Sequence, residues 1–245
     1  MDHREYIRRC PDSSKAALLI HGIVGTPRHF DRFLDAIPAD WSVYNILLDG
    51  HGGTVKDFGE TSMDAWKKQV DDWLDKLCRE YETVVIIAHS MGTLLSLEAA
   101  SRYPKVRQMI LFNIPLIPRI TGEMAVRSMK YAFDRIDQND PLERAVFEAA
   151  GVTADKHLWR YLGWIPRYLE LFKLCKKIRR DIQNTAVPCW VFQSTKDELV
   201  SPRTNLYLKN NASICYTELT DSTHFYYPET DARMIKNCIH NILSQ

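Results

Sequence analysis

The sequence predicts an α/β fold with a mostly parallel sheet flanked by helices, and two observations carry that prediction. Short apolar runs recur along the chain, and helix-compatible stretches separate them. Runs that are apolar on both faces are typical of strands buried between helices, and the alternation favours parallel strands joined by right-handed crossovers. Ligands of such sheets bind beyond the carboxyl ends of the strands, so residues that follow each run are the functional candidates.

Six runs are expected to form the strands. Most of them end at glycine or at a polar residue, which suits a chain leaving the sheet. The sixth run is the most mixed in character. The runs are Ala16–Ile20, Val43–Leu48, Val84–Ala88, Val106–Phe112, Pro188–Phe192 and Ile214–Leu219.

Helices are expected between these runs. Thr61 or Ser62 is a plausible cap for a helix whose apolar residues, including Trp66, Val70 and Leu74, share one face. A second helix, 91–103, follows the third strand and is stopped by proline. Later helices are expected at 202–208 and 231–243.

Residues 114–185 break the alternation because they contain no convincing buried strand. This segment has helix-like patterns with many aromatic residues, opens with two prolines and closes with a basic run. We interpret it as a helical cap over the strand ends, inserted into a core formed by 1–113 and 186–245. The alternative is that its helices are further scaffold. Among its aromatic residues, Trp159 and Trp164 are candidates for substrate binding.

Composition excludes several classes of protein. The chain has 245 residues and a formal charge of +1, so it lacks the basic excess of a nucleic-acid-binding protein. The first residues are polar, without the apolar core of a signal peptide, and no run reaches the roughly 18 residues of a membrane span. The six cysteines have neither metal nor disulfide spacing, which indicates a reducing, cytoplasmic setting. Oligomeric state is not readable.

Ser90 is the candidate nucleophile. The run VVIIAHSMGT places it between a buried strand and a helix, on a sharp turn that strains the backbone and needs small neighbours. Gly92 meets that need, and Ala88 stands where glycine is usual. Such a turn presents the hydroxyl beside the amides of the helix start.

A serine hydroxyl needs a base to attack a carbonyl at neutral pH, and the base needs a carboxylate. Of the histidines that follow Ser90, His240 lies in a helix pattern and His157 in the inserted segment. His224 lies in a loop directly after the last strand, which is the position expected of the base. The alternative is that His224 is a surface loop histidine without a catalytic role.

Asp197 is the candidate acid because it follows the strand PCWVFQ, beyond a carboxyl end. Glu198 is adjacent but is expected to point elsewhere. Asp221 is too close in sequence to His224 to reach its far nitrogen. The alternative for Asp197 is a solvated turn carboxylate.

The oxyanion of an acyl intermediate needs two donors. The backbone N–H of Met91, directly after the nucleophile, is one candidate. The N–H of Ile23 is the other, since Gly22 allows a tight turn after the first core strand. The sequence DGHGGT at 49–54 does not match a phosphate-binding loop and is interpreted as a structural turn. The histidines show no metal-site spacing, so no metal or other cofactor is expected.

With these residues identified, the chain resembles the α/β-hydrolase family, and most of all small carboxylesterases and monoacylglycerol lipases with a helical cap. The resemblance rests on LLIHGIVGTP, LLDGHGGT, AHSMGT, STKDELVSP and STHF, and covers nearly the whole chain. These motifs are specific to the fold and its triad, and much less specific to substrate. Since the N-terminus is too short for the family's full set of leading strands, we expect a sheet of six or seven.

These residues together predict a serine hydrolase in which Ser90, His224 and Asp197 cleave a carboxylic ester through an acyl-enzyme that water releases. A small or medium acyl or aryl ester suits the aromatic insertion. Two alternatives stay open: a thioesterase or acyltransferase with the same triad, and a non-catalytic ligand-binding protein on the same fold.

Overall fold

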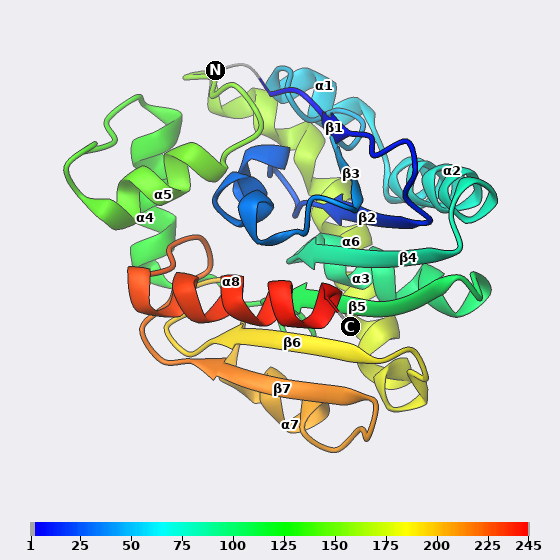
Figure 1. The fold of residues 1–245 in the computed structure, drawn as a ribbon. Coiled ribbons are helices and arrows are strands. Elements are labelled where there is room, and N and C mark those ends of the chain that lie inside the picture. Colours follow the sequence, from blue (N-terminus) through cyan, green and yellow to red (C-terminus); the bar gives the residue numbers. More distant parts are fainter. Residues whose placement is uncertain (1–2, 245) are drawn as a thin grey trace.

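The computed structural model describes residues 3–244 and contains a seven-stranded sheet in the order β1-β3-β2-β4-β5-β6-β7 (Figure 1). All neighbouring strands are parallel except β1 and β3, which are antiparallel. The predicted mostly parallel sheet is therefore confirmed. The strands are β1 (Tyr6–Arg8), β2 (Lys15–Ile20), β3 (Ser42–Ile46), β4 (Thr83–His89), β5 (Val106–Phe112), β6 (Cys189–Ser194) and β7 (Ile214–Leu219).

Strand β1 is the one that no apolar run indicated. It has three residues, lies at the sheet edge and leaves Tyr6 and Ile7 exposed, so it needs no apolar pattern.

Eight α-helices surround the sheet in the described part of the chain. Ser62, rather than Thr61, caps the long α2, and its hydroxyl accepts the N–H of Ala65 at 3.1 Å. The helix expected over 91–103 ends its α-helical part at Ala99 and continues as one 3₁₀ turn. The helices are α1 (Val55–Glu60), α2 (Met63–Glu80), α3 (Met91–Ala99), α4 (Gly122–Ala132), α5 (Pro141–Ala149), α6 (Ile165–Asp181), α7 (Asn205–Leu208) and α8 (Glu229–Leu243).

Five 3₁₀ segments join them, and one of these, η1, covers a face of the sheet. Helix α1 and η1 were not expected from the sequence. A capping box between Thr54 and Asp57 starts α1, where the glycine-rich stretch suggested only a turn. The segments are η1 (Pro27–Ala36), η2 (Ala100–Arg102), η3 (Leu158–Trp164), η4 (Ile182–Asn184) and η5 (Pro202–Thr204).

Two apolar cores lie on the two faces of the sheet. Ala16, Leu18 and Ile20 of β2 face a core shared with α1, α2, α3 and α6. Ala17 and Leu19 face the other core, shared with η1 and α8, which crosses the sheet in Figure 1. Side chains that alternate between two buried faces explain why the strands read as continuous apolar runs.

The segment 114–185, called the cap segment below, joins β5 to β6 and places α4 and α5 beyond the arrowheads of the strands (Figure 1). Helix α6 serves two purposes. Its first turns line a cavity beside Ser90, whereas Leu174, Cys175 and Ile178 are buried in the core that includes α3. The division into cap and core at 114 and 185 stays a prediction. None of the helices within residues 3–244 is long and apolar enough to cross a membrane.

Candidate active site

Ser90 lies on a strained turn between β4 and α3. Its backbone has φ 52° and ψ −122°, a region that side-chain-bearing residues rarely adopt. Gly92 makes the turn possible, because a Cβ there would lie 2.2 Å from the carbonyl oxygen of Ile20. Ala88 is fully buried and pairs in register with Ile20 and Leu111, so the strand accommodates its methyl group.

The structure brings the three predicted triad residues together from three loops. His224 Nε2 lies 3.0 Å from Ser90 Oγ, and His224 Nδ1 lies 2.7 Å from Asp197 Oδ2. The side chains of His224 and Asp197 are each 1% exposed. Because the Asp197 carboxylate accepts at Nδ1, that nitrogen carries the proton and Nε2 is free to take the serine proton.

The Asp197 carboxylate is held by the backbone of its own loop. Its second oxygen accepts the N–H groups of Leu199 and Val200 at 2.7 and 2.8 Å. Asp221, rejected as the acid, is exposed and pairs with Lys196 at 2.8 Å. The arrangement therefore orients one carboxylate toward the imidazole and turns the other to solvent.

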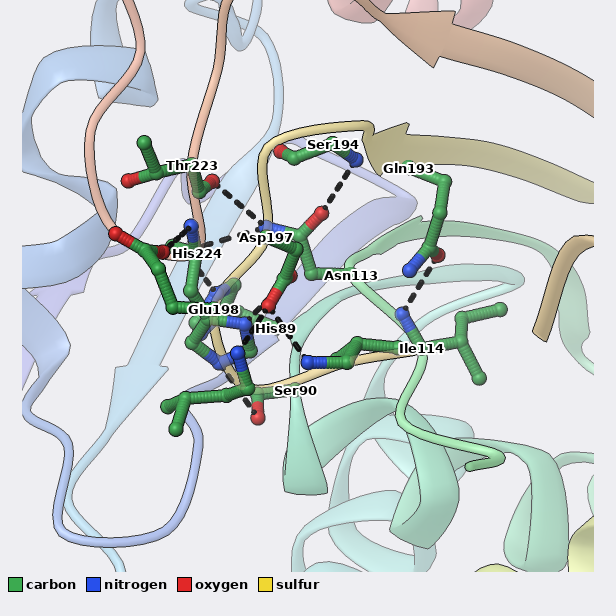
Figure 2. Close-up of polar contacts among 12 residues, drawn as sticks. His89, Ser90, Asn113, Ile114, Gln193, Ser194, Asp197, Glu198, Thr223 and His224 are labelled. Atoms are coloured by element: carbon green, nitrogen blue, oxygen red, sulfur yellow. Dashed lines mark hydrogen bonds and ion pairs between the residues drawn. The ribbon is translucent and has the colours of Figure 1, made fainter. Parts of the chain in front are cut away.

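Three further residues hold the His224 loop, as Figure 2 shows, and sequence reasoning gave none of them this role. Asn113, at φ 52°, donates to the His224 carbonyl oxygen at 3.2 Å and accepts the Ser194 N–H at 2.8 Å, so it ties the loops together. His89 Nε2–H donates to the same carbonyl at 3.0 Å. Glu198 points away from the imidazole ring, as expected, but its carboxylate accepts the backbone N–H of His224 at 3.1 Å.

The two candidate oxyanion donors come from the loop after β2 and from the start of α3. The Ile23 residue lines the cavity with Ser90, and Met91 opens α3. Val24 is held in an unusual conformation, φ 54°, between two partners: its N–H donates to His51 Nε2 at 3.1 Å, and its carbonyl accepts the Gly151 N–H at 2.7 Å. A positive φ is costly for a β-branched residue, so these two bonds hold Val24 in that conformation, next to the candidate donor Ile23.

Four histidines near the site are held in the neutral form, three of them buried and one, His29, half-buried. Burial lowers the pKa of His51 to about 4 and that of His29 to about 3, and lowers the pKa values of His21 and His89 well below the ordinary range. Neutrality fits their bonds, since His51 Nε2 and His21 Nε2 each accept a backbone N–H, from Val24 and Leu48. His21, His51 and His89 therefore act as uncharged hydrogen-bonding groups, whereas His29 stacks on His89.

A cavity of about 620 Å³ opens beside Ser90 and His224. Its walls are mostly apolar, and α4, α5, η3 and the start of α6 contribute to them; Met124, Val146, Tyr161, Tyr168 and Leu171 are among the lining residues. Trp164 also lines it and donates through Nε1 to the Val55 carbonyl at 2.9 Å. Trp159, the other predicted contact, is 65% exposed and lies outside the lining set.

The cap segment is fastened by backbone hydrogen bonds to the loops that carry Asp197 and Ile23. Residues 117–121 bond to residues 198–201 of the loop that joins β6 to η5 and carries Asp197, called the acid loop below. One of these bonds runs from the Arg119 N–H to the Leu199 carbonyl at 2.8 Å. Residues 151–153 bond to Val24 and to 52–53, and a Cβ on Gly151 would lie 1.7 Å from the Gly25 carbonyl oxygen. The cap thus contacts both the acid loop and the loop that carries Ile23.

The fold and this arrangement define an α/β-hydrolase. More particularly, the chain belongs to the family described as serine aminopeptidase, S33, whose model matches residues 11–229. It is 24% identical over 194 residues to a thermostable monoacylglycerol lipase of Bacillus sp. (strain H-257), an alignment that covers 76% of this chain and 71% of the lipase.

Two further similarities are more local or purely structural. A pimeloyl-[acyl-carrier protein] methyl ester esterase of Neisseria meningitidis is 34% identical over 116 residues, covering 45% of this chain and 34% of that enzyme. A solved structure from work on LipS and LipT, two metagenome-derived lipolytic enzymes, superimposes with a TM-score of 0.76 over 99% of this chain and 98% of the other, at 16% identity. This last likeness supports the fold alone.

Proposed function

We propose that this protein is a serine hydrolase of carboxylic esters, of the carboxylesterase or monoacylglycerol lipase type. The observation that carries the proposal is the hydrogen-bonded series from Ser90 through His224 to Asp197 at the wall of an apolar cavity. The similarity to esterases and lipases among the relatives supports it.

In the proposed reaction, His224 Nε2 takes the proton of Ser90 as the hydroxyl attacks the ester carbon. Asp197 stabilises the imidazolium, and the N–H groups of Ile23 and Met91 receive the negative oxygen of the tetrahedral intermediate. His224 then gives its proton to the leaving alcohol, and the acyl group stays on Ser90. Water attacks that acyl-enzyme with His224 as base and releases the acid.

The cavity walls favour an ester over a peptide with a free amino terminus. An aminopeptidase needs a carboxylate to pair with the substrate's ammonium group, and within residues 3–244 no aspartate or glutamate lines the cavity. An apolar site of this volume suits a small or medium acyl or aryl group instead. Water completes the reaction, and the proposal invokes no cofactor.

Replacement of Ser90 tests the proposal. We expect Ser90→Ala to lower kcat for a p-nitrophenyl ester by about 10⁴-fold or more while thermal unfolding stays near that of the wild type. Ser96→Ala is the matched control, because the Ser96 hydroxyl is on the same helix and bonded to the Gly92 carbonyl at 2.7 Å. Retention of full activity in Ser90→Ala would refute the nucleophile.

Two experiments separate the alternatives. A fluorophosphonate probe should label wild-type protein at Ser90, since only an activated serine reacts; an unlabelled protein would favour a binding protein on this fold. A panel of short acyl esters, monoacylglycerols, aryl esters and thioesters, run with and without an alcohol acceptor, distinguishes esterase from thioesterase and acyltransferase. We expect hydrolysis of oxygen esters to dominate.

A further inference from the structure

The Glu198 side chain is not needed for the proton relay proposed above, yet it is buried beside it. Only 6% of the residue is exposed. One carboxylate oxygen accepts the backbone N–H of His224 at 3.1 Å, and the other accepts Arg127 Nη1 at 2.7 Å. Figure 2 shows Glu198 directly against His224.

We propose that Glu198 is a positioning residue for His224, and that Arg127 of the cap helix α4 holds Glu198 in place, so that the cap helps to set the geometry of the base. The inference rests on the proposed function and deepens it. It assigns the cap a part in the reaction besides covering the substrate.

Burial explains why Glu198 depends on Arg127. A carboxylate removed from water is costly unless a cation and hydrogen bonds compensate it. Arg127 is itself only 13% exposed at its side chain, and its other carboxylate neighbour, Glu123, lies 3.8 Å away and is 79% exposed. Glu198 is thus the inner partner of this arginine, and the bond crosses from the cap segment to the acid loop.

The charge of Glu198 acts on the imidazole as well as on the backbone. The groups around His224 are Asp197 at Nδ1, Ser90 at Nε2, the neutral His89 at its carbonyl and His29 stacked behind His89. Arg119 contacts the Asp197 backbone carbonyl from the cap side. Glu198 makes no bond to the ring, but its negative charge lies at the His224 backbone N–H and therefore favours the imidazolium that forms as serine is deprotonated.

Glu198→Gln tests the proposal through the pH profile. We expect kcat for a p-nitrophenyl ester to fall about tenfold or more, KM to change less than about twofold, and the acid limb of kcat/KM to move to lower pH. The limb moves in that direction because the imidazolium loses a stabilising charge, so the neutral base persists further into acid. A merely structural role would not move the limb.

Glu123→Gln is the matched control, since it removes the exposed carboxylate from the same arginine and should leave kcat and the profile unchanged. An unaltered kcat and acid limb in Glu198→Gln, or an equal loss in Glu123→Gln, would overturn the proposal.

A second pair of variants decides the matter if Glu198→Gln fails to fold. Arg127→Met should lower kcat as Glu198→Gln does, and Arg127→Lys should restore most of it by returning a cation. Equal kcat in the two arginine variants would contradict the inference. Labelling of the wild type by fluorophosphonate keeps the two proposals separate: an unlabelled, inactive wild type refutes the function, whereas an active wild type with indifferent Glu198 and Arg127 variants refutes the positioning role alone.

Discussion

At the scale of single residues, the space around Ser90 is set by atoms of the neighbouring strand and loop. Gly92 faces the Ile20 carbonyl, and a Cβ on Gly22 would lie 2.9 Å from the Ser90 Cβ. No side chain fits at position 92 unless the backbone of β2 or α3 moves. The strain of the turn is therefore kept by packing rather than by local preference.

We expect Gly92→Ala to lower the free energy of unfolding by about 3 kcal/mol and to reduce fluorophosphonate labelling of Ser90, because the added methyl group displaces the turn. Chemical denaturation and the labelling rate measure the two effects. Gly122→Ala is the control: it also adds a methyl group at a helix start, but a Cβ there meets nothing within 4 Å. Equal stability of the two variants would contradict this account.

Much of the site was predictable at this scale, because each triad residue follows a strand. Ser90 has a strained-turn motif, and Asp197 and His224 come after the apolar runs of β6 and β7. Asn113 and Glu198 carried no such motif. Their roles depend on which loops meet in space. Both residues bond to the backbone of His224, which is far from them in the sequence.

At the scale of elements, the turn after β3 supports the loop after β2. His51 comes from the stretch interpreted as a structural turn, and its Nε2 accepts the N–H of Val24, while Gly50 and Gly52 take positive φ values of 73° and 81° around it. The turn is thus structural, as predicted, and it also orients the loop that carries Ile23. The strand order, which the sequence did not specify, is what makes the two loops neighbours.

We expect His51→Leu to lower kcat about 10- to 100-fold with little change in KM, because a displaced Ile23 amide stabilises the transition state less and the ground state equally. His51→Gln offers an amide oxygen to Val24 and should recover most of the loss. Steady-state kinetics of the two variants provide the measurement. Indistinguishable kcat values would show that the Val24 hydrogen bond has no part in catalysis.

The shortest elements were the hardest to predict. Strand β1 has too few apolar residues to form a recognisable run. Helix α1 begins in a glycine-rich stretch where only its capping box marks a helix. The helical character of residues 114–185 was predictable from their helix-like patterns and the missing strands. Which of its aromatic residues face the cavity was not, since Trp159 and Trp164 lie on the same short 3₁₀ segment and have different surroundings.

At the scale of the whole molecule, the four neutral histidines couple folding to pH. Their pKa values are lowered in the folded state, so the unfolded chain binds more protons once the pH drops below about 6.5. The contribution of these neutral histidines to the free energy of unfolding is therefore fully present above that pH and declines as the pH falls toward 4. The slope of stability against pH grows with the number of these histidines that take up a proton only in the unfolded chain.

We expect His29→Phe to reduce that slope by about one proton, because phenylalanine keeps the stacking on His89, 3.8 Å between ring centroids, without a group that must stay uncharged. Urea denaturation at several values between about pH 4.5 and 7 measures the slope. His240→Gln, at an exposed position on α8, should leave it unchanged. A His29→Phe slope equal to the wild type would show that His29 is not among the linked groups.

The two backbone junctions of the cap also define where the protein can be recombined. Residues 117–121 and 151–153 bond to loops of the core, so the stretch between them can be exchanged for that of a relative if Tyr131, whose hydroxyl donates to the Val152 carbonyl at 2.7 Å, is kept. A chimaera made at these points would replace the cavity walls that α4 and α5 supply and keep those of η3 and α6, and the proposed role of Glu198 requires the incoming helix to supply a cation at position 127. The part of the cavity wall that α4 and α5 supply is thus separable from the loops that hold Ser90, Asp197 and His224, and Arg127 is the residue that a replacement has to match.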